Sequence, residues 1–268
     1  MCPPKGTHLA SEPETSLMER KRMFDFEVKI AQNEKEIQES LKLRYEIFKI
    51  EMGSGSQIKE AEELETDPFD KFCDHLIVID KTVDKVVGTY RLLLGSKVDK
   101  KLGFYSERFF EIGNIKKLAW DNEILELGRS CIHKDYRSRA VINLLWSGIA
   151  KYVKDNNVRY LFGPVRLLTH DTDQVSKTFR FIKENFYSDN EFRVHPRAEN
   201  EIKGLNENIE VENSAEIYRG LPPLIKGYLR VGVKVCGEPA LNPALNSVVI
   251  LILLDTEKMS ETYRHHYT

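Results

Sequence analysis

Apolar positions along the chain repeat with two periods, which predict two kinds of element. Alternation of apolar and polar residues indicates β-strands, and apolar residues three and four positions apart indicate amphipathic helices. The strand pattern occurs at residues 24–31, 74–80, 85–94, 124–133, 159–168, 234–239 and 247–255. The helical pattern occurs at residues 33–50, 140–157, about 173–186 and 221–232. Strands and helices mixed in this order predict an α/β fold with helices on both faces of a sheet.

Signals at the ends of these segments support the assignments. Asn33 is a predicted N-cap for the first helix, and the polar residues 81–84 predict a hairpin turn between two strands. A chain of 268 residues, 41% of them hydrophobic, is long enough to bury one large core. We therefore predict a mobile, polar tail at residues 1–23 and a single domain over residues 24–268.

One long segment of the domain has no clear period. Residues 188–215 carry many charges and show neither the strand nor the helix pattern. A long irregular segment inside a compact domain is typically a lid or a binding loop. We therefore expect this segment to cover a binding groove.

Charge and cysteine content exclude several classes of protein. A net charge of −2 gives no general attraction to nucleic acid, so an anionic partner must meet a local basic cluster. The four cysteines lie far apart without a CxxC pair, which argues against a zinc site and a disulfide framework. Residues 1–23 lack a signal-peptide core, and the longest apolar run, residues 248–254, is too short to span a bilayer. We expect a cytoplasmic protein without metal, with transient contact at most with the inner membrane face.

Two charged residues stand inside the strand that begins at Ile124. Strict alternation places Glu126 and Arg129 on opposite faces, but a glycine inside a strand often marks a bulge that shifts the alternation. A bulge at Gly128 would let Glu126 and Arg129 face the same way as a pair. The pair fits a structural ion pair at the end of a sheet and equally an active-site pair, because perturbed charges occur in both.

The residues that follow this strand favour the active-site interpretation. A basic turn at residues 133–139, His-Lys-Asp-Tyr-Arg-Ser-Arg, opens the helix at residues 140–157. Unpaired N–H groups and the helix dipole at such an N-terminus form a site for phosphate. The alternative is an ordinary solvated loop.

Three long motifs resemble one group of acyltransferases. They are LELGRSCIHKDYRS at 125–138, AVINLLWSGIAKY at 140–152 and PPLIKGYLRVGVKVCGEPAL at 222–241. Together they resemble the ornithine lipid acyltransferases, a group also labelled hemolysin-like, within the GNAT superfamily. The resemblance covers roughly residues 24–254. A second similarity, limited to short motifs, is to the acyl-homoserine lactone synthases. It lies in LRYEIF at 43–48, DPFD at 67–70 and YRLLL at 90–94.

The resemblance implies the GNAT fold, a three-layer αβα sandwich whose mixed central sheet splays apart between two strands. The acyl thioester and its pantetheine arm would lie in this gap, delivered by acyl carrier protein or coenzyme A as a co-substrate, with no permanently bound cofactor. Arg137 stands at the arginine of the superfamily's phosphate loop, whereas Ala140 and Ile142 stand where glycine or a small residue is usual. This departure favours a donor with a single phosphate, so acyl carrier protein is the expected partner.

The resemblance also implies roles for individual residues. Amine attack on a thioester needs a base and donors for the oxyanion, so Glu126 is expected to be the base and Arg129 to orient it. Backbone N–H groups near Ser130 and Cys131 would meet the oxyanion. The residues expected to bind the rest of the donor are Lys134, Arg137 and Arg139. Those expected to bind the small amine or amino acid are Arg44, Phe48, Asp67, Asp70 and Arg91.

Other residues carry weaker signals. His133 could relay a proton, although a histidine at a strand end is more often structural. Cys131 has no local catalytic partner and reads as a small buried residue. After GEPAL the acyltransferase group usually has acidic residues, whereas this chain has Asn242, Ala244 and Asn246. An acceptor other than ornithine is therefore an open alternative.

Three functions fit these observations. The favoured hypothesis is an N-acyltransferase that moves a fatty acyl group from acyl carrier protein to the amine of an amino acid such as ornithine. The second is an enzyme like the acyl-homoserine lactone synthases, which do not share the long C-terminal motif. The third is a non-catalytic, hemolysin-like protein that binds acyl chains or lipids, and the absence of a strongly amphipathic lytic helix speaks against it.

Overall fold

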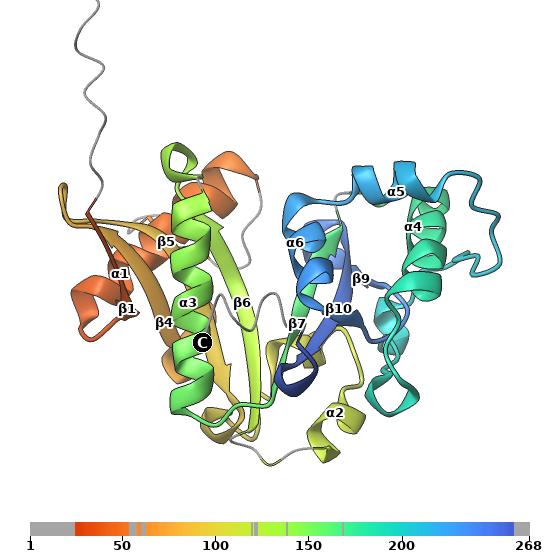
Figure 1. Cartoon of the computed structure of the whole chain (residues 1–268), viewed down its shortest axis with the longest axis horizontal. Helices are drawn as coiled ribbons and strands as arrows, with labels where there is room; N and C mark the ends of the chain where they lie inside the picture. The colour runs from red at the N-terminus through yellow and green to blue at the C-terminus, as the bar shows by residue number, and fades with distance from the viewer. Residues whose placement is uncertain are drawn as a thin grey trace, which may run out of the picture.

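One mixed sheet of eight strands runs through the middle of the protein, in the order β1-β4-β5-β6-β7-β10-β8 with β9 paired to β10 (Figure 1). Its strands are β1 (Phe26–Ile30), β4 (Asp74–Asp80), β5 (Lys85–Leu94), β6 (Ile124–Ile132), β7 (Tyr160–Leu167), β8 (Lys234–Val235), β9 (Ala240–Asn242) and β10 (Ser247–Asp255). Within this sheet the paired strands are antiparallel, except β6 and β7, which are parallel. Two short strands, β2 (Ile58–Lys59) and β3 (Leu64–Glu65), pair separately.

The structure is a computed structural model that describes residues 25–53, 58–59, 63–118, 120, 123–137, 139–167 and 169–259. The tail predicted at residues 1–23 lies outside the described residues. Among the described helices, none is both long and apolar enough to cross a membrane.

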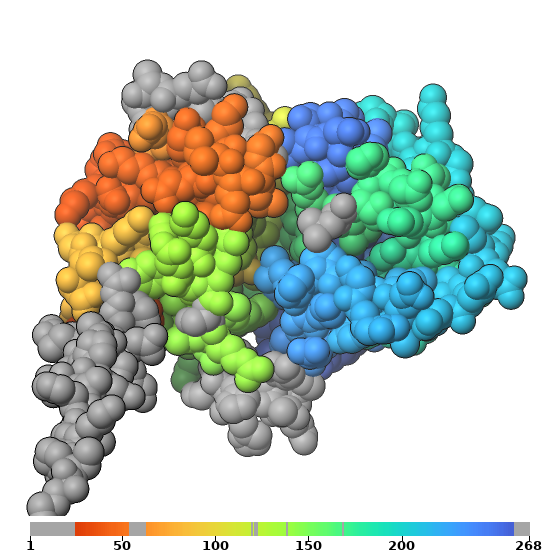
Figure 2. Space-filling model, turned by 90° about the horizontal axis from the view of Figure 1, so that it is seen from above, coloured from red at the N-terminus to blue at the C-terminus, as the bar shows by residue number. Residues whose placement is uncertain are grey.

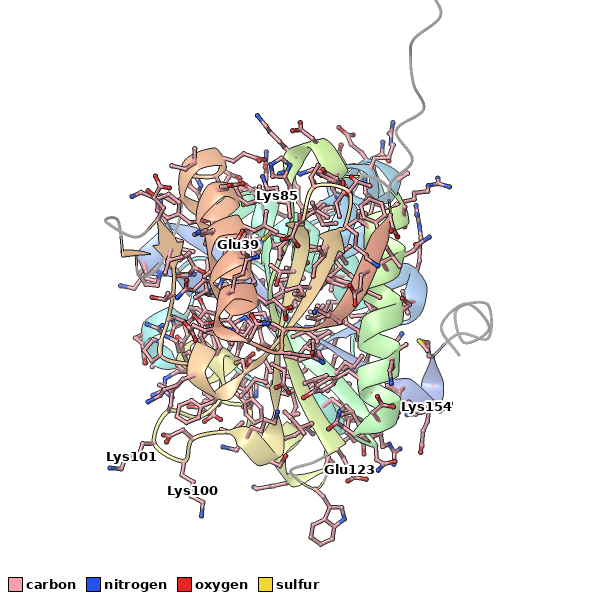
Figure 3. The ribbon with its side chains drawn as sticks, turned by 90° about the vertical axis from the view of Figure 1, so that its left-hand side faces the viewer. Glu39, Lys85, Lys100, Lys101, Glu123 and Lys154 are labelled. Atoms are coloured by element: carbon pink, nitrogen blue, oxygen red, sulfur yellow. The ribbon has the colours of Figure 1, made fainter. Side chains whose placement is uncertain are left out.

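Helices cover both faces of the sheet, which confirms the predicted three-layer αβα arrangement. The helices are α1 (Glu34–Arg44), α2 (Gly113–Lys117), α3 (Arg139–Asp155), α4 (Thr172–Asn185), α5 (Ser214–Gly220) and α6 (Pro223–Val231). The view along the sheet shows α1 and α3 on opposite sides of the strands, with Glu39 on α1 and Lys154 near the end of α3 (Figure 3). The largest core cluster lies under α3, α4 and α6, and a second, rich in phenylalanine, lies on the other face.

Short helical turns connect these elements. A π-helix, η1 (Tyr45–Glu51), continues α1, and the 3₁₀ turns are η3 (Asp70–Phe72), η4 (Gly95–Lys97), η5 (Tyr105–Arg108), η7 (Lys134–Tyr136), η8 (Asn190–Phe192), η9 (Ala198–Asn200), η10 (Pro243–Leu245) and η11 (Thr256–Lys258). The predicted cap at Asn33 is confirmed, because its side chain accepts a hydrogen bond from the N–H of Glu36. Helices α2 and α5 were not predicted from the sequence.

Helix α3 lies close to the sheet because a glycine faces it. A Cβ atom placed on Gly148 would be 2.8 Å from side-chain carbons of both Val28 and Leu76, on strands β1 and β4. Real Cβ contacts are longer than this, so a larger residue would push the helix away from the strands. The glycine therefore fixes the depth at which α3 packs.

The sheet opens between β6 and β7, as expected for this fold. The two strands pair only from Ile124 to Glu126, opposite Tyr160 to Phe162. The next residues of β7 are Gly163 and Pro164, and proline has no N–H to continue a ladder. Beyond this point β6 and β7 diverge towards the end of the molecule at which α3 begins (Figure 1).

The segment at residues 188–215, predicted as a lid, packs against the second half of the sheet. Isolated bridges join Val194 to Gly237 and Glu201 to Ala240, and Phe192 and Val194 are buried. The end of the segment begins α5. None of its described residues lines the cavity described below, so the structure places it on a different part of the surface.

Candidate active site

A cavity of about 990 Å³ lies where β6 and β7 part. Leu127 to Ile132 of β6 and Leu161 to Arg166 of β7 form its two sides. Apolar residues of α3 and α6 form the wall on one face of the sheet, and Glu65, Tyr105 and Phe109 contribute on the other. Seen from above, the half with α1 and α3 and the half with α4 to α6 lie on either side of this junction (Figure 2). A largely apolar cavity with a few converging polar groups is the usual form of a ligand site.

A β-bulge shapes the β6 side of the cavity, as predicted. Thr89 of β5 pairs with Cys131, and Arg91 pairs with Gly128, so two β6 residues stand opposite one β5 residue. The backbone in the left-handed region belongs to Arg129, with φ of 50°, and not to the glycine. Such a backbone is costly for a residue with a side chain and is concentrated at functional sites.

Glu126 is held by the turn η5 and not by Arg129. Its carboxylate accepts hydrogen bonds from the N–H groups of Tyr105 and Ser106, both at 2.7 Å, and from the Ser106 hydroxyl. Burial raises the pKa of Glu126 above its ordinary value, against the effect of these hydrogen bonds. The predicted pairing of Glu126 with Arg129 is therefore wrong, because the bulge turns Arg129 towards β3 and the η5 turn satisfies the carboxylate.

The connection between Glu126 and Arg129 runs through Tyr105. The Tyr105 N–H donates to Glu126, while the Arg129 guanidinium lies 4.7 Å from the centre of the Tyr105 ring. Tyr105 and Arg129 both line the cavity, whereas Glu126 does not. The carboxylate therefore fixes the position of a cavity residue from behind.

Six charged side chains form a buried network next to this wall: Arg44, Glu65, Asp67, Asp70, Arg91 and Arg129. Arg44 contacts Glu65 at 2.5 Å and Asp70 at 2.7 Å. Arg91 contacts Asp67 at 2.6 Å and Asp70 at 3.1 Å. Arg129 contacts Asp67 at 2.9 Å and Glu65 at 3.2 Å. Three guanidiniums match three carboxylates, which makes the burial of these charges tolerable.

The network contains four of the five residues predicted to bind the amine. Phe48 lines the cavity, so its predicted role in amine binding stays a prediction. The other four, Arg44, Asp67, Asp70 and Arg91, lie behind the cavity wall. Although burial opposes it, Arg44 holds the pKa of Asp70 well below its usual range, so Asp70 stays charged for the network. Their role in amine binding stays a prediction, and in this structure each of the four is paired with an opposite charge.

Glu65 is the network member that the sequence did not single out. It is 1% exposed, and it lines the cavity at the end of β3. It stood in an acidic stretch, Glu-Ala-Glu-Glu-Leu-Glu-Thr-Asp at residues 60–67, that reads as a solvated loop. The sequence feature that could have indicated a buried position for Glu65 is the apolar residue Leu64 beside it, with which it forms the two-residue strand β3.

Two tyrosines meet on the opposite side of the bulge. The hydroxyl groups of Tyr90 on β5 and Tyr228 on α6 hydrogen-bond to each other, and both residues line the cavity. Burial raises the pKa of both phenols, and the Ser130 side chain is close enough to Tyr90 to influence its pKa in the opposite direction. At neutral pH these phenols therefore keep their protons and can donate them.

The residues predicted to bind the donor divide into two groups. Ser130, Cys131 and Arg137 line the cavity, and Arg137 also pairs with Glu51 at 2.6 Å. Lys134 and Arg139 are exposed and lie outside the cavity wall. The basic turn therefore has one member inside the site and two on the adjacent surface.

Cys131 and His133 have surroundings that fit structural roles. Burial raises the pKa of Cys131 to about 12, so the thiol is not a ready nucleophile. His133 lies 3.7 Å from Glu46 and does not line the cavity. Among the residues that the structure describes, no group of three or more His, Cys, Asp or Glu side chains could hold a metal ion.

Comparison with known proteins gives consistent matches. Residues 43–147 match the family described as the acetyltransferase (GNAT) domain. The L-ornithine N(alpha)-acyltransferase of Brucella abortus is 30% identical over 92% of this chain and 90% of its own length. The enzyme of the same name from Rhodobacter capsulatus is 31% identical over 91% of this chain and 95% of its own length.

Solved structures show the same fold at low sequence identity. The coenzyme A-dependent acyl-homoserine lactone synthase BjaI matches with a TM-score of 0.51 and 14% identity, over 84% of this chain and 78% of its own. FeeM, an N-acyl amino acid synthase from uncultured soil microbes, matches with a TM-score of 0.51 and 10% identity, over 88% of this chain and 93% of its own. At these identities the likeness concerns the fold alone.

Proposed function

Because this chain belongs to the family of L-ornithine N(alpha)-acyltransferases and is an acyltransferase, we propose that it transfers a fatty acyl group from a thioester to the α-amine of ornithine or a related amino acid. The observation that carries this proposal is the cavity between the splayed strands, apolar on the α3 and α6 side and lined by charged residues at the bulge. An apolar wall suits a fatty acyl chain, and polar groups suit an amino acid.

The donor is proposed to be acyl carrier protein. Arg137 lines the cavity before α3 and can meet the phosphate of a pantetheine arm, with Lys134 and Arg139 on the surface beside it. Exposed cations placed outside the cavity suit an acidic carrier protein better than a small nucleotide that would enter the cavity. Ala140 and Ile142 follow this turn where a pyrophosphate loop would have smaller residues.

In the proposed reaction the acceptor nitrogen attacks the thioester carbonyl. The amide C–N bond forms, the C–S bond breaks, and the sulfur leaves as a thiolate that takes up a proton. Beyond Glu126, the described residues of β6 form no backbone hydrogen-bond ladder with β7. The backbone N–H groups near Ser130 can therefore donate hydrogen bonds to the oxyanion. The Tyr90 and Tyr228 hydroxyls lie on this side of the cavity, and we assign Tyr228 as the proton donor to the thiolate.

The acceptor ammonium must lose a proton before it attacks. Two of the described carboxylates line the cavity, Glu51 and Glu65. Glu51 pairs with Arg137 at 2.6 Å, and Glu65, which lies beside Arg129 at the bulge, is the proposed proton acceptor. The base role expected for Glu126 is reassigned to Glu65, because the Glu126 carboxylate lies behind the wall and does not line the cavity. Glu126 is instead proposed to position Tyr105 and Ser106.

Purified protein incubated with an acyl donor and single acceptors tests the proposal. Palmitoyl acyl carrier protein and palmitoyl coenzyme A are compared as donors, with ornithine, other amino acids and S-adenosylmethionine as acceptors. We expect thiol release with an amino acid and an N-acyl amino acid by mass spectrometry, with the carrier protein as the better donor. A lactone formed from S-adenosylmethionine would instead support an acyl-homoserine lactone synthase, and acyl binding without turnover would support the non-catalytic alternative.

A further inference from the structure

One arginine of the cavity wall has no ion-pair partner in the part of the chain that the structure describes. Arg166 of β7 lines the cavity, and its Nε atom is buried without a hydrogen-bond partner. The three arginines of the buried network, by contrast, each contact two carboxylates at 3.2 Å or less. An uncompensated guanidinium next to an apolar cavity favours an anionic ligand.

Arg166 lies on the same face of the sheet as the charged network. Its direct partner on β10 is Val249, and Val249 belongs to the core cluster that contains Phe109 and Phe162. Directly opposed residues of an antiparallel pair project from the same face. The Arg166 side chain is therefore on the face of Glu65 and Tyr105, opposite the apolar wall formed by α3 and α6.

Two further polar residues accompany Arg166 on this face. Ser247 is 2% exposed and lines the cavity, and its buried Oγ has no hydrogen-bond partner among the described residues. It precedes Val249 by two residues, so it projects from the same face of β10. Asn242 of β9 is directly opposite Ser247 and also lines the cavity. A guanidinium, a hydroxyl and an amide thus gather on three adjacent strands at one end of the cavity.

We propose that Arg166, Ser247 and Asn242 form a subsite for the carboxylate of the acceptor amino acid, an assignment that rests on the proposed function. A guanidinium offers two parallel N–H donors that match the two oxygens of a carboxylate. The Ser247 hydroxyl and the Asn242 amide each offer another donor. A carboxylate bound here would satisfy the buried Nε and Oγ atoms, for which the described part of the chain provides no partner.

The subsite has a consequence for which amine is acylated. In an α-amino acid the carboxylate and the α-amine are bonded to the same carbon atom. A carboxylate fixed at Arg166 therefore restricts the α-amine to its immediate surroundings, whereas a side-chain amine lies several bonds away. The subsite selects amino acids over simple amines, and it selects the α-nitrogen over a side-chain nitrogen.

The phosphate of the acyl donor is also an anion, so it could in principle bind Arg166. The proposed phosphate site, however, is elsewhere in the cavity. The basic residues Lys134 and Arg137 lie in the turn before α3, on the β6 side of the cavity, and Arg139 is the first residue of α3. Arg166, Ser247 and Asn242 belong to β7, β10 and β9, in the other half of the sheet. We therefore assign the anion at Arg166 to the acceptor, and the kinetic experiment separates the two sources.

Kinetics of the full-length chain with ornithine and with ornithinamide, whose carboxylate is replaced by a neutral amide, test the subsite. Arg166→Gln should raise the Michaelis constant for ornithine by about 10-fold to 100-fold, the effect of losing hydrogen bonds between charged groups. The constants for ornithinamide and for the acyl donor should change little, and Arg166→Lys should restore part of the loss. With ornithine the Gln variant should also give product acylated on the side-chain amine.

Arg159→Gln is the matched control. Arg159 directly precedes β7, pairs with Asp255 and Glu257, and does not line the cavity, so its variant should keep the wild-type preference for ornithine over ornithinamide. Binding is measured separately as the rise in melting temperature caused by ornithine without donor. If no amino acid is acylated but this rise is present and depends on Arg166, the subsite stands and the proposed function fails.

Three results would overturn the subsite. The first is an equal loss for ornithine and ornithinamide in Arg166→Gln, which would show a general structural effect. The second is a rise confined to the Michaelis constant of the donor, which would make Arg166 a phosphate contact. The third is an Arg166→Gln variant that binds and acylates ornithine like the wild type.

Discussion

Gly163 lies so close to Leu127 that a Cβ atom on the glycine would be 2.3 Å from the Leu127 carbonyl oxygen. This contact joins β7 to β6 directly after their last paired residues, Glu126 and Phe162. The atom in the way belongs to the backbone, which cannot rotate aside as a side chain can. The cavity therefore opens from a fixed point in the sheet, and its width depends on a residue without a side chain.

Gly163→Ala should destabilise the protein and disturb the cavity. Forcing β6 and β7 apart at their closest approach should lower the free energy of unfolding by about 1–3 kcal/mol, the usual cost of overpacking. Urea unfolding measures this change, and acyl transfer should fall with it. Gly220→Ala is the control, because a Cβ there has nothing within 4 Å. Equal stability of the two variants would show that the contact at Gly163 is not tight.

Replacing Arg129 by glycine and by alanine separates its backbone from its charge. Both variants lose the contacts with Glu65 and Asp67, but only glycine adopts the φ of 50° without strain. Arg129→Gly should therefore be more stable than Arg129→Ala by about 1 kcal/mol. At Arg91, which is not among the residues with positive φ, the order should reverse, since glycine weakens a regular strand. Thermal unfolding of the four variants gives the comparison, and an alanine variant as stable as glycine at position 129 would contradict it.

Glu65→Gln and Glu126→Gln should lower acyl transfer for different reasons. Removing a proton acceptor lowers the rate by about a hundredfold or more. We expect this result for Glu65→Gln. Glu126→Gln should lower the rate but keep the shape of the pH profile, because its amide N–H₂ would face an N–H donor in η5 and shift Tyr105.

The pH profiles decide which carboxylate takes the proton. If the pH dependence disappears in Glu126→Gln and persists in Glu65→Gln, Glu126 is the base that the sequence resemblance implied. Unfolding measurements accompany the kinetics, because both glutamates are buried and hydrogen-bonded.

Tyr228→Phe removes the proposed proton donor while keeping the ring. The raised pKa of Tyr228 keeps the wild-type phenol protonated through the neutral range, so its loss should lower the turnover number at least about tenfold at all neutral pH values. Tyr152→Phe also removes a phenol, one that donates to Asp74 and does not line the cavity, and it should keep normal turnover. Stopped-flow measurement of thiol release compares them, and a normal rate in Tyr228→Phe would remove this residue from the mechanism.

Charge reversal on the surface tests the carrier protein as donor. Lys134→Glu with Arg139→Glu should raise the Michaelis constant for acyl carrier protein, and the effect should shrink at high salt as the Debye length falls from about 10 Å to about 3 Å. The constant for a short acyl-pantetheine should stay unchanged, since both residues lie outside the cavity. Arg137→Glu, inside the cavity, should affect both donors. Equal effects of the double reversal on both donors would argue against a carrier-protein surface.

The sequence by itself determined most of the long strands and helices of this protein and the group of proteins to which it belongs. The signals for period and capping are local in the sequence. They therefore predicted the longer strands of the main sheet, helix α1 with its cap at Asn33, and the bulge near Gly128. The long motifs led to the acyltransferase group for the same reason, because a motif is a run of neighbouring residues. The αβα fold and the splayed sheet followed from that resemblance.

Only the tertiary structure decided which charges meet. Glu126 and Arg129 are three residues apart, yet each takes partners from segments 20 or more residues away, Ser106 for one and Asp67 for the other. Arg166 and Ser247 come from strands that are neighbours in the sheet but far apart in the chain. A buried charge is tolerated only where an opposite charge or donor comes within hydrogen-bond distance, and strand order and register set that distance. Spacing along the sequence carries no information about such pairs. Candidates inside motifs, such as Glu126 and Arg129, were therefore predictable, whereas their partners and the cavity residues Glu65, Arg166 and Ser247 were not.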